Sequence, residues 1–220
     1  MKTFVFSTSS RGLPIIGYRF ENSGPEILVL GGVHGDEPEG VVAGLGLLKH
    51  LMQAYSYKLN LTLVPQFNLD GIIDKIRMNA RGVDLNRNLP TKDWSPVAKT
   101  VRYNPGPKPL SEPENQGLVQ FMQAQNVKFI CSLHSWEPMI NINGACEEEA
   151  QAISSVTKYK IEKDIGYPTP GSLGTYAGLE RNIPTITYEI QRDMDLNAVN
   201  QAHLPALLAM LKVCESKYVS

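Results

Sequence analysis

Two histidines and a glutamate have the spacing of a catalytic metal site. His34 and Glu37 lie three residues apart in a glycine-flanked turn, and His134 follows about a hundred residues later. A catalytic zinc ion takes three protein ligands from His and Asp or Glu and keeps a fourth position for water. His34 and Glu37 can aim at one point, and His134 is the natural third ligand. Taken singly, the same residues also suit purely structural roles: a turn histidine beside a glutamate that favours a helix N-terminus, and a core histidine.

Glu189 is the candidate general base. It stands among Thr187, Tyr188 and Ile190 in a largely apolar strand. Carboxylates are seldom buried unless they are paired or used. A base here would take a proton from water and pass it to a leaving amine. The alternative is an exposed acid at the end of a strand.

Residues 77–88 concentrate groups that bind anions. These twelve residues hold three arginines and three asparagines: Arg77, Arg81, Arg87, Asn79, Asn86 and Asn88. The guanidinium is a planar fork that binds a carboxylate through two N–H groups, and asparagine adds a neutral donor. A peptidase that cuts at a free C-terminus needs such a clamp, and it needs a cation near the scissile carbonyl. A solvated basic loop is the alternative, but it does not explain the interleaved asparagines.

Strands that alternate with helices must position these residues. Apolar runs predict strands at 26–32, 59–67, 127–133 and 184–190, and shorter β-rich runs occur at 3–7 and 14–20. Helices are expected over 41–51, near 148–162 and over 198–215. The alternation predicts an α/β fold with a mixed, mostly parallel twisted sheet flanked by helices. Residues 68–71 are predicted to form a turn, and residues 77–110 a long functional loop.

The candidate residues fall at one edge of this sheet. His34, the turn at 68–71, His134 and Glu189 all come at or just beyond the ends of predicted strands. In open α/β sheets, ligands bind at the carboxyl ends of the strands. We therefore expect the active site at this edge.

Composition narrows the class of protein. The 220 residues are 42% apolar and 20% charged, which predicts one globular catalytic domain over residues 1–220. With 21 basic and 22 acidic residues, the net charge of −1 lacks the field expected of a binder of nucleic acid or membranes. Three cysteines without CxxC spacing, and no targeting or membrane-spanning segment, predict a cytoplasmic protein with reduced thiols.

His50 and His203 lie in helical stretches without acidic neighbours at ligand spacing, so we expect structural roles for them.

The motifs resemble those of the zinc carboxypeptidases of the carboxypeptidase A type. The matching segments keep the family's order and span most of residues 26–190: GGVHGDEP (31–38), NLDG (68–71), RMNARGVDLNRNLP (77–90), PLSEPEN (109–115), SLHSW (132–136) and TYEI (187–190). The resemblance implies a carboxypeptidase-like fold and one Zn²⁺ ion per chain. It implies a hydrolase in which water attacks the amide carbonyl.

The resemblance also assigns catalytic roles by position. It implies three zinc ligands, His34, Glu37 and His134. It implies Glu189 as general base and acid, and Arg77 as the arginine that polarises the scissile carbonyl. Arg81 stays open as an alternative to Arg77 because it lies close by in the sequence.

The expected substrate is a small peptide with a free carboxylate. The resemblance implies that Asn86 and Arg87 hold that carboxylate, and Tyr167 falls about one residue from the family's mobile substrate-binding tyrosine. Within the family, NARGVDLNRN, SEPEN and GYPTPGS look most like the bacterial murein peptide amidases, which cleave the γ-D-glutamyl–meso-diaminopimelate bond of murein tripeptide during peptidoglycan recycling. Two positions depart from the pattern: Leu89 stands where relatives carry an aromatic residue, and Leu173 aligns with the floor of the specificity pocket without an acid there.

Three alternatives remain open at this point. One is a related deacylase of the succinylglutamate desuccinylase or aspartoacylase type, although SLHSW speaks against it. The second is a carboxypeptidase of other specificity. The third is an inactive module that binds peptide carboxylates.

Overall fold

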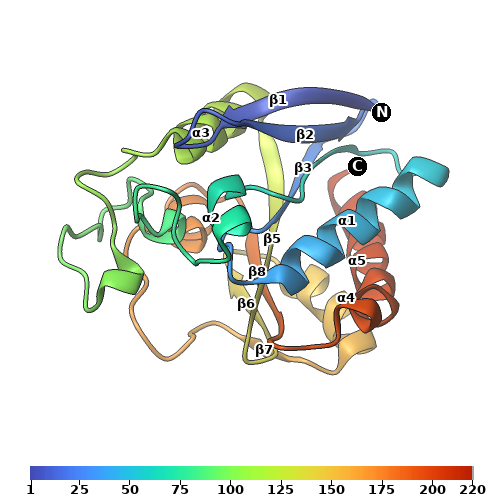
Figure 1. Cartoon of the computed structure of the whole chain (residues 1–220). Helices are drawn as coiled ribbons and strands as arrows, with labels where there is room; N and C mark the ends of the chain where they lie inside the picture. The colour runs from blue at the N-terminus through green and yellow to red at the C-terminus, as the bar shows by residue number, and fades with distance from the viewer. Residues whose placement is uncertain (220) are drawn as a thin grey trace.

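Eight strands form one sheet in the computed structural model, which describes residues 1–219 (Figure 1). In chain order the strands are β1 (Lys2–Thr8), β2 (Pro14–Phe20), β3 (Glu26–Gly31), β4 (Asn60–Val64), β5 (Val127–Trp136), β6 (Met139–Asn143), β7 (Lys160–Glu162) and β8 (Thr185–Gln191). They lie in the order β1-β2-β4-β3-β5-β8-β6-β7. Pairing is parallel for β4-β3-β5-β8 and for β6-β7, and antiparallel for β1-β2, β2-β4 and β8-β6. The predicted mixed, mostly parallel α/β sheet is confirmed.

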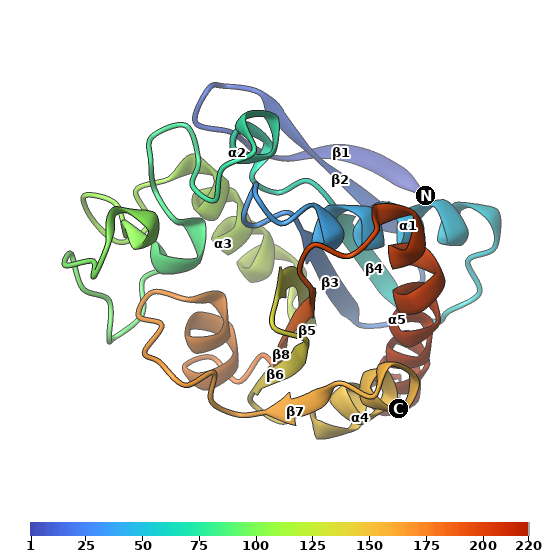
Figure 2. The same ribbon diagram turned by 60° about the horizontal axis from the view of Figure 1, so that its bottom comes forward.

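Helices cover both faces of this sheet (Figures 1 and 2). The helices are α1 (Pro38–Gln53), α2 (Leu69–Asp74), α3 (Pro113–Gln125), α4 (Glu147–Thr157) and α5 (Leu196–Tyr218). The first face packs on α1, α4 and α5, and the second on α3 and on the irregular segment after α2. Side chains of β3 alternate between the two cores: Ile27 and Val29 face the first, while Leu28 and Leu30 face the second. Within residues 1–219, no helix is both long and apolar enough to cross a membrane.

Three neighbouring parallel strands carry the candidate residues. Since β3, β5 and β8 are adjacent and parallel, their carboxyl ends meet at one edge. His134 lies inside β5, not beyond its end, and it pairs in register with Glu189 of β8. The predicted strand end at residue 133 was too early because pairing with β8 continues to Trp136.

The segment 68–71 begins a helix, so the predicted turn was wrong. Asn68 caps α2 by accepting a hydrogen bond from the Gly71 amide at 3.0 Å. Gly71 also lies against the turn that contains Gly35, where a Cβ on Gly35 would be 1.9 Å from the Gly71 carbonyl carbon. The turn-type residues therefore serve helix capping and a close approach of two backbones.

Two other predicted segments have mixed outcomes. The helix expected near 148–162 ends at Thr157, because Lys158 adopts a left-handed conformation with φ of 64° and the chain continues into β7. Residues 77–110 form the predicted long loop, interrupted by 3₁₀ turns at Leu85–Arg87 and Val101–Tyr103.

Candidate metal centre and active site

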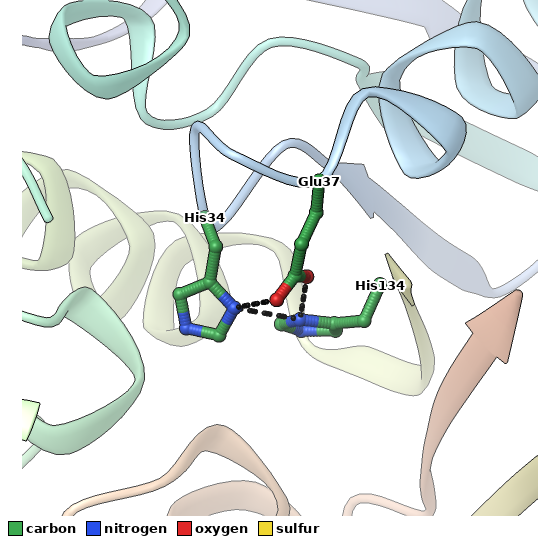
Figure 3. A group of neighbouring side chains, drawn as sticks. All are labelled: His34, Glu37 and His134. Atoms are coloured by element: carbon green, nitrogen blue, oxygen red, sulfur yellow. Dashed lines mark hydrogen bonds and ion pairs between the residues drawn. The ribbon is translucent and has the colours of Figure 1, made fainter. Parts of the chain in front are cut away.

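The side chains of His34, Glu37 and His134 converge on one point (Figure 3). The two carboxylate oxygens of Glu37 lie 2.8 Å from His34 Nδ1 and 2.9 Å from His134 Nδ1. The two Nδ1 atoms are 3.1 Å apart, and all three residues are buried. His34 and Glu37 come from the connection between β3 and α1, whereas His134 comes from β5.

This donor set fits a zinc ion. Four tetrahedral ligand atoms at zinc bonds of about 2.0–2.1 Å lie about 3.3 Å from one another, and the separations here are 2.8, 2.9 and 3.1 Å. The outward-facing ring nitrogens already have partners: His34 Nε2 is 3.1 Å from Asp84 Oδ1, and His134 Nε2 is 3.0 Å from Ser132 Oγ. Such partners fix the ring orientation and leave Nδ1 free for a metal. Burial raises the pKa of Glu37, but His34 and His134 outweigh that effect and hold the pKa well below its usual range.

Arg77 lies beside this cluster, and Arg81 does not. Arg77 Nε donates to Asp84 Oδ2 at 2.9 Å, and its Nη1 is 3.3 Å from Glu37 Oε1. Its side chain is 10% exposed and lines the cavity over the cluster. Arg81 points away into solvent with a side chain 55% exposed, 3.8 Å from Glu112. Of the two arginines that the sequence left open, only Arg77 is close enough to act at the metal centre.

Asp84 joins the histidine and the arginine. Burial raises the pKa of this carboxyl, but Arg77 and His34 hold it far below its usual range, so Asp84 is ionised. It also caps the 3₁₀ turn at Leu85–Arg87 by accepting a hydrogen bond from the Asn86 amide at 2.9 Å. One aspartate therefore couples the orientation of His34, a candidate zinc ligand, to the segment that carries the candidate anion-binding residues Asn86 and Arg87.

Glu189 faces the same cavity from β8. Its Oε2 atom is buried without a hydrogen-bond partner among the described residues. Its pKa is raised to about 7: burial is the largest cause, His134 opposes it by lowering the pKa, and Glu37 adds to the rise. A carboxylate held without a protein donor is available to accept a proton from water.

Asn86 and Arg87 line one wall of the cavity. Asn86 Oδ1 accepts the Leu173 amide at 2.8 Å, which leaves its NH₂ group without a protein partner in the described chain. Arg87 is 6% exposed, its guanidinium donates only to the Asn86 carbonyl, at 2.7 Å, and no carboxylate among residues 1–219 pairs with it. An amide donor and an uncompensated guanidinium side by side suit a carboxylate ligand.

Aromatic side chains lie beside Arg77 and Arg87 and elsewhere in the cavity lining. The ring of Tyr103 lies 5.2 Å from the Arg77 guanidinium carbon and 5.4 Å from that of Arg87. Tyr167 lines the cavity and packs edge-on against Trp136, with ring centroids 5.8 Å apart. Burial raises the pKa of the Tyr167 hydroxyl, which keeps it a neutral donor.

The cavity has a volume of about 360 Å³. Besides the cluster of His34, Glu37 and His134, several polar side chains line it: Asn141, Asn143, Ser172, Thr175 and Thr187. Leu173 was expected at the pocket floor, but its side chain packs into the buried core of the second sheet face, and only its amide approaches the cavity. Ser172, Gly174 and Thr175, the chain neighbours of Leu173, line the cavity instead, together with residues of strands β6 and β8.

Several residues around the site did not stand out in the sequence. Asp84 and Ser132 lie inside the family motifs, so their positions, next to LNRN and two residues before His134, were an available signal. Tyr103 lies in the irregular loop, where no periodicity marks it. The other histidines lie elsewhere, as expected: His203 of α5 is 2.5 Å from the Tyr188 hydroxyl, and His50 is in the last turn of α1.

Comparisons with known proteins agree with this geometry. Residues 1–202 match the family model described as zinc carboxypeptidase. The murein peptide amidase A of Vibrio campbellii (strain ATCC BAA-1116) is 30% identical over 221 residues, covering 94% of this chain and 86% of that protein. The crystal structure of murein-tripeptide amidase MpaA from Escherichia coli O157 superposes with a TM-score of 0.79 at 25% identity, covering 98% of this chain and 92% of that one. Carboxypeptidase A from Helicoverpa armigera shares the fold, with a TM-score of 0.83 at 17% identity over 100% of this chain and 69% of that one.

Proposed function

Because the chain belongs to the zinc carboxypeptidase family and is a zinc-dependent hydrolase, we propose that it removes the C-terminal residue of murein tripeptide. The bond cleaved is the amide between γ-D-glutamate and meso-diaminopimelate in L-Ala-γ-D-Glu-meso-diaminopimelate. The similarity to two proteins named as murein peptide or murein-tripeptide amidases supports this choice of substrate.

One observation carries the proposal. A single cavity holds the cluster of His34, Glu37 and His134, the unpartnered carboxylate of Glu189 and the uncompensated guanidinium of Arg87. The two histidines and Glu37 are ligands that zinc prefers, Glu189 is a base, and Arg87 is an anion-binding group. This combination suits hydrolysis of an amide next to a carboxylate.

The residues then have complementary roles in the reaction. Bound zinc supplies Lewis acidity, which polarises the amide carbonyl and makes water acidic near neutral pH. Glu189 accepts a proton from the attacking water and later delivers it to the nitrogen of the breaking C–N bond, so that the products are a carboxylic acid and an amine. Arg77 donates to the carbonyl oxygen as negative charge develops there.

The substrate is held by its terminal groups. Arg87 and the NH₂ group of Asn86 bind the terminal carboxylate, and Tyr167 closes on the bound residue from the rim. The polar side chains of the cavity lining, among them Asn141, Asn143 and Thr187, suit the amino and carboxyl groups at the far end of a diaminopimelate side chain better than they suit an apolar side chain.

The proposal extends to organisation and compartment. Residues 1–220 form a single catalytic domain, in keeping with the family match over residues 1–202. The protein works in the cytoplasm on recycled peptide. The free, buried thiols of Cys131, Cys146 and Cys214 suit a reducing compartment.

A substrate panel tests the proposed function. The zinc-loaded protein is incubated with murein tripeptide, a hippuryl-type carboxypeptidase substrate and N-succinylglutamate, and the products are identified by mass spectrometry. We expect release of diaminopimelate from the tripeptide with a kcat/KM well above that for the other two. Turnover of N-succinylglutamate alone would establish the deacylase alternative, and turnover of the hippuryl substrate alone a carboxypeptidase of other specificity. Binding of tripeptide without turnover would indicate an inactive binding module.

A further inference from the structure

Two arginines at the rim of the cavity share one carboxylate. Arg102 Nη2 donates to Asp36 Oδ2 at 2.7 Å, and Arg192 Nη2 donates to the same oxygen at 3.0 Å and to the Asp36 carbonyl at 2.8 Å. Asp36 Oδ1 is buried and has no donor among the described residues. Asp36 therefore engages each guanidinium through one nitrogen only, and it neutralises one of two positive charges.

Most donors of these two arginines are unused. Within residues 1–219, Nε and Nη1 of Arg102 and of Arg192 make no hydrogen bond, and the side chains are 46% and 33% exposed. Both arginines line the same cavity as His34, Glu37 and His134. Arg11, outside the cavity, binds Asp74 through two nitrogens, whereas Arg102 and Arg192 each bind the Asp36 carboxylate through one. The remaining N–H groups of the Arg102–Arg192 pair are free for a second anion.

The pair is attached to the catalytic side of the cavity. Asp36 directly precedes Glu37, and Arg192 follows Glu189 by three residues, directly after the end of β8. The terminal carboxylate of the substrate has its own cation in Arg87, which has no ion-pair partner in the described chain. The cavity thus offers two separate positions with unbalanced positive charge, and one of them is tied to the residues that act on the scissile carbonyl.

We propose that Arg102 and Arg192 bind a second substrate carboxylate, carried by the residue that contributes the scissile carbonyl. This inference rests on the proposed function. In a γ-D-glutamyl peptide the glutamate keeps its α-carboxylate, which three carbon atoms (Cα, Cβ and Cγ) separate from the carbonyl carbon that is attacked. An ordinary α-linked peptide has no carboxylate at that place unless its side chain supplies one. The arginine pair is then a specificity determinant for γ-glutamyl substrates.

A pair of matched substrates tests the inference. The first is L-Ala-γ-D-Glu-meso-diaminopimelate, and the second is the same tripeptide with the glutamate α-carboxylate converted to a carboxamide. Charge-assisted hydrogen bonds of half-exposed arginines are screened by water, so we expect the lower end of their range, about a tenfold higher kcat/KM for the carboxylate substrate. The preference should shrink as ionic strength rises.

Variants separate binding from structure. Arg102→Met and Arg192→Met should each reduce the preference, and the double variant should bring the ratio of the two kcat/KM values close to one. Arg11→Met is the matched control, because Arg11 has a side chain 44% exposed and pairs with Asp74 outside the cavity. Its ratio should equal that of the wild type. A purely structural role for Arg102 and Arg192 would lower both kcat/KM values by the same factor and leave the ratio unchanged, which would overturn the inference.

The outcomes also separate the inference from the proposed function. If the wild type cleaves both substrates with equal kcat/KM, the arginine pair does not bind the α-carboxylate, whereas the amidase function stands. If the wild type cleaves neither substrate, the proposed function is wrong and the inference falls with it.

Discussion

Replacement of Asp84 by asparagine tests the role of the carboxylate that contacts His34, a candidate zinc ligand. Asp84 is fully buried, and both of its oxygens are occupied: Oδ1 is 3.1 Å from His34 Nε2, and Oδ2 is 2.9 Å from Arg77 Nε. Asparagine has the same shape but no charge and only one acceptor. If its oxygen stays on His34, its NH₂ group faces the Arg77 donor. If the amide is reversed, His34 loses its acceptor.

The structure sets the size of the expected effect. Loss of the partner that orients a metal-binding histidine typically lowers metal affinity by about ten- to a hundredfold, and we expect that range for zinc. Removal of one partner from a buried ion pair costs about 3–5 kcal/mol. Arg77 keeps its contact with Glu37 at 3.3 Å. We therefore expect the free energy of unfolding of the metal-free protein to fall by about 2–3 kcal/mol, below that full penalty.

Two assays measure these effects separately. Competition with a chromophoric chelator gives the zinc affinity, and urea unfolding of the metal-free protein gives stability. Asp74→Asn is the matched control, because Asp74 also pairs with an arginine, Arg11, but on the surface, so both quantities should stay near wild type. A zinc affinity of Asp84→Asn equal to that of the wild type would refute the claim that this carboxylate orients His34.

Three further predictions concern catalysis, substrate binding and pH. Glu189→Gln should retain zinc and lower kcat by about a hundredfold or more, and a variant as active as the wild type would remove Glu189 from the reaction. Arg87→Lys should raise KM about tenfold because lysine cannot form the two-pronged contact; Arg11→Lys is the control, and an unchanged KM would exclude Arg87 from carboxylate binding. Burial lowers the pKa of His203 to about 4. Below about pH 6.5 the folded state therefore binds fewer protons than the unfolded state, because His203 stays neutral in the fold. The free energy of unfolding should fall by about 2–3 kcal/mol as the pH drops from about 6.5 to about 4. Urea unfolding at several pH values should show a smaller loss of stability for His203→Gln than for the wild type. The same dependence of the free energy of unfolding on pH in both proteins would contradict this prediction.

The sheet was predictable because its central strands are continuous apolar runs. β3 is buried at every position, and its sequence shows this directly. The ends of elements were less predictable. His134 was expected at or just beyond the end of its strand but lies inside β5, because pairing with β8 extends the strand, and only the tertiary structure supplies β8. Asn68 has the chemistry of both a turn and a helix cap, and packing against Gly35 decides between them.

The residues of the candidate site were likewise only partly predictable from the sequence. The chain has only four histidines, so His34 and His134 stood out in the sequence. Glu37 stood out by its spacing from His34, and Glu189 by its place in a largely apolar strand. The choice between Arg77 and Arg81 depended on which side chain faces the cavity, which spacing in a loop does not determine. Contacts such as Asp36 with Arg102 and Arg192 join residues 66 and 156 positions apart, so no local pattern marks them.

The metal content of the protein tests the assignment of the zinc ligands most directly. Wild-type protein is loaded with zinc, dialysed against metal-free buffer and measured by atomic spectroscopy beside His134→Ala and the control His50→Ala, whose histidine lies in the last turn of α1 away from the cavity. Since His134 Nδ1 lies within 3.1 Å of both other donors, we predict one zinc per chain in the wild type and in His50→Ala, and none in His134→Ala. Retention of a full equivalent of zinc by His134→Ala would contradict the assignment.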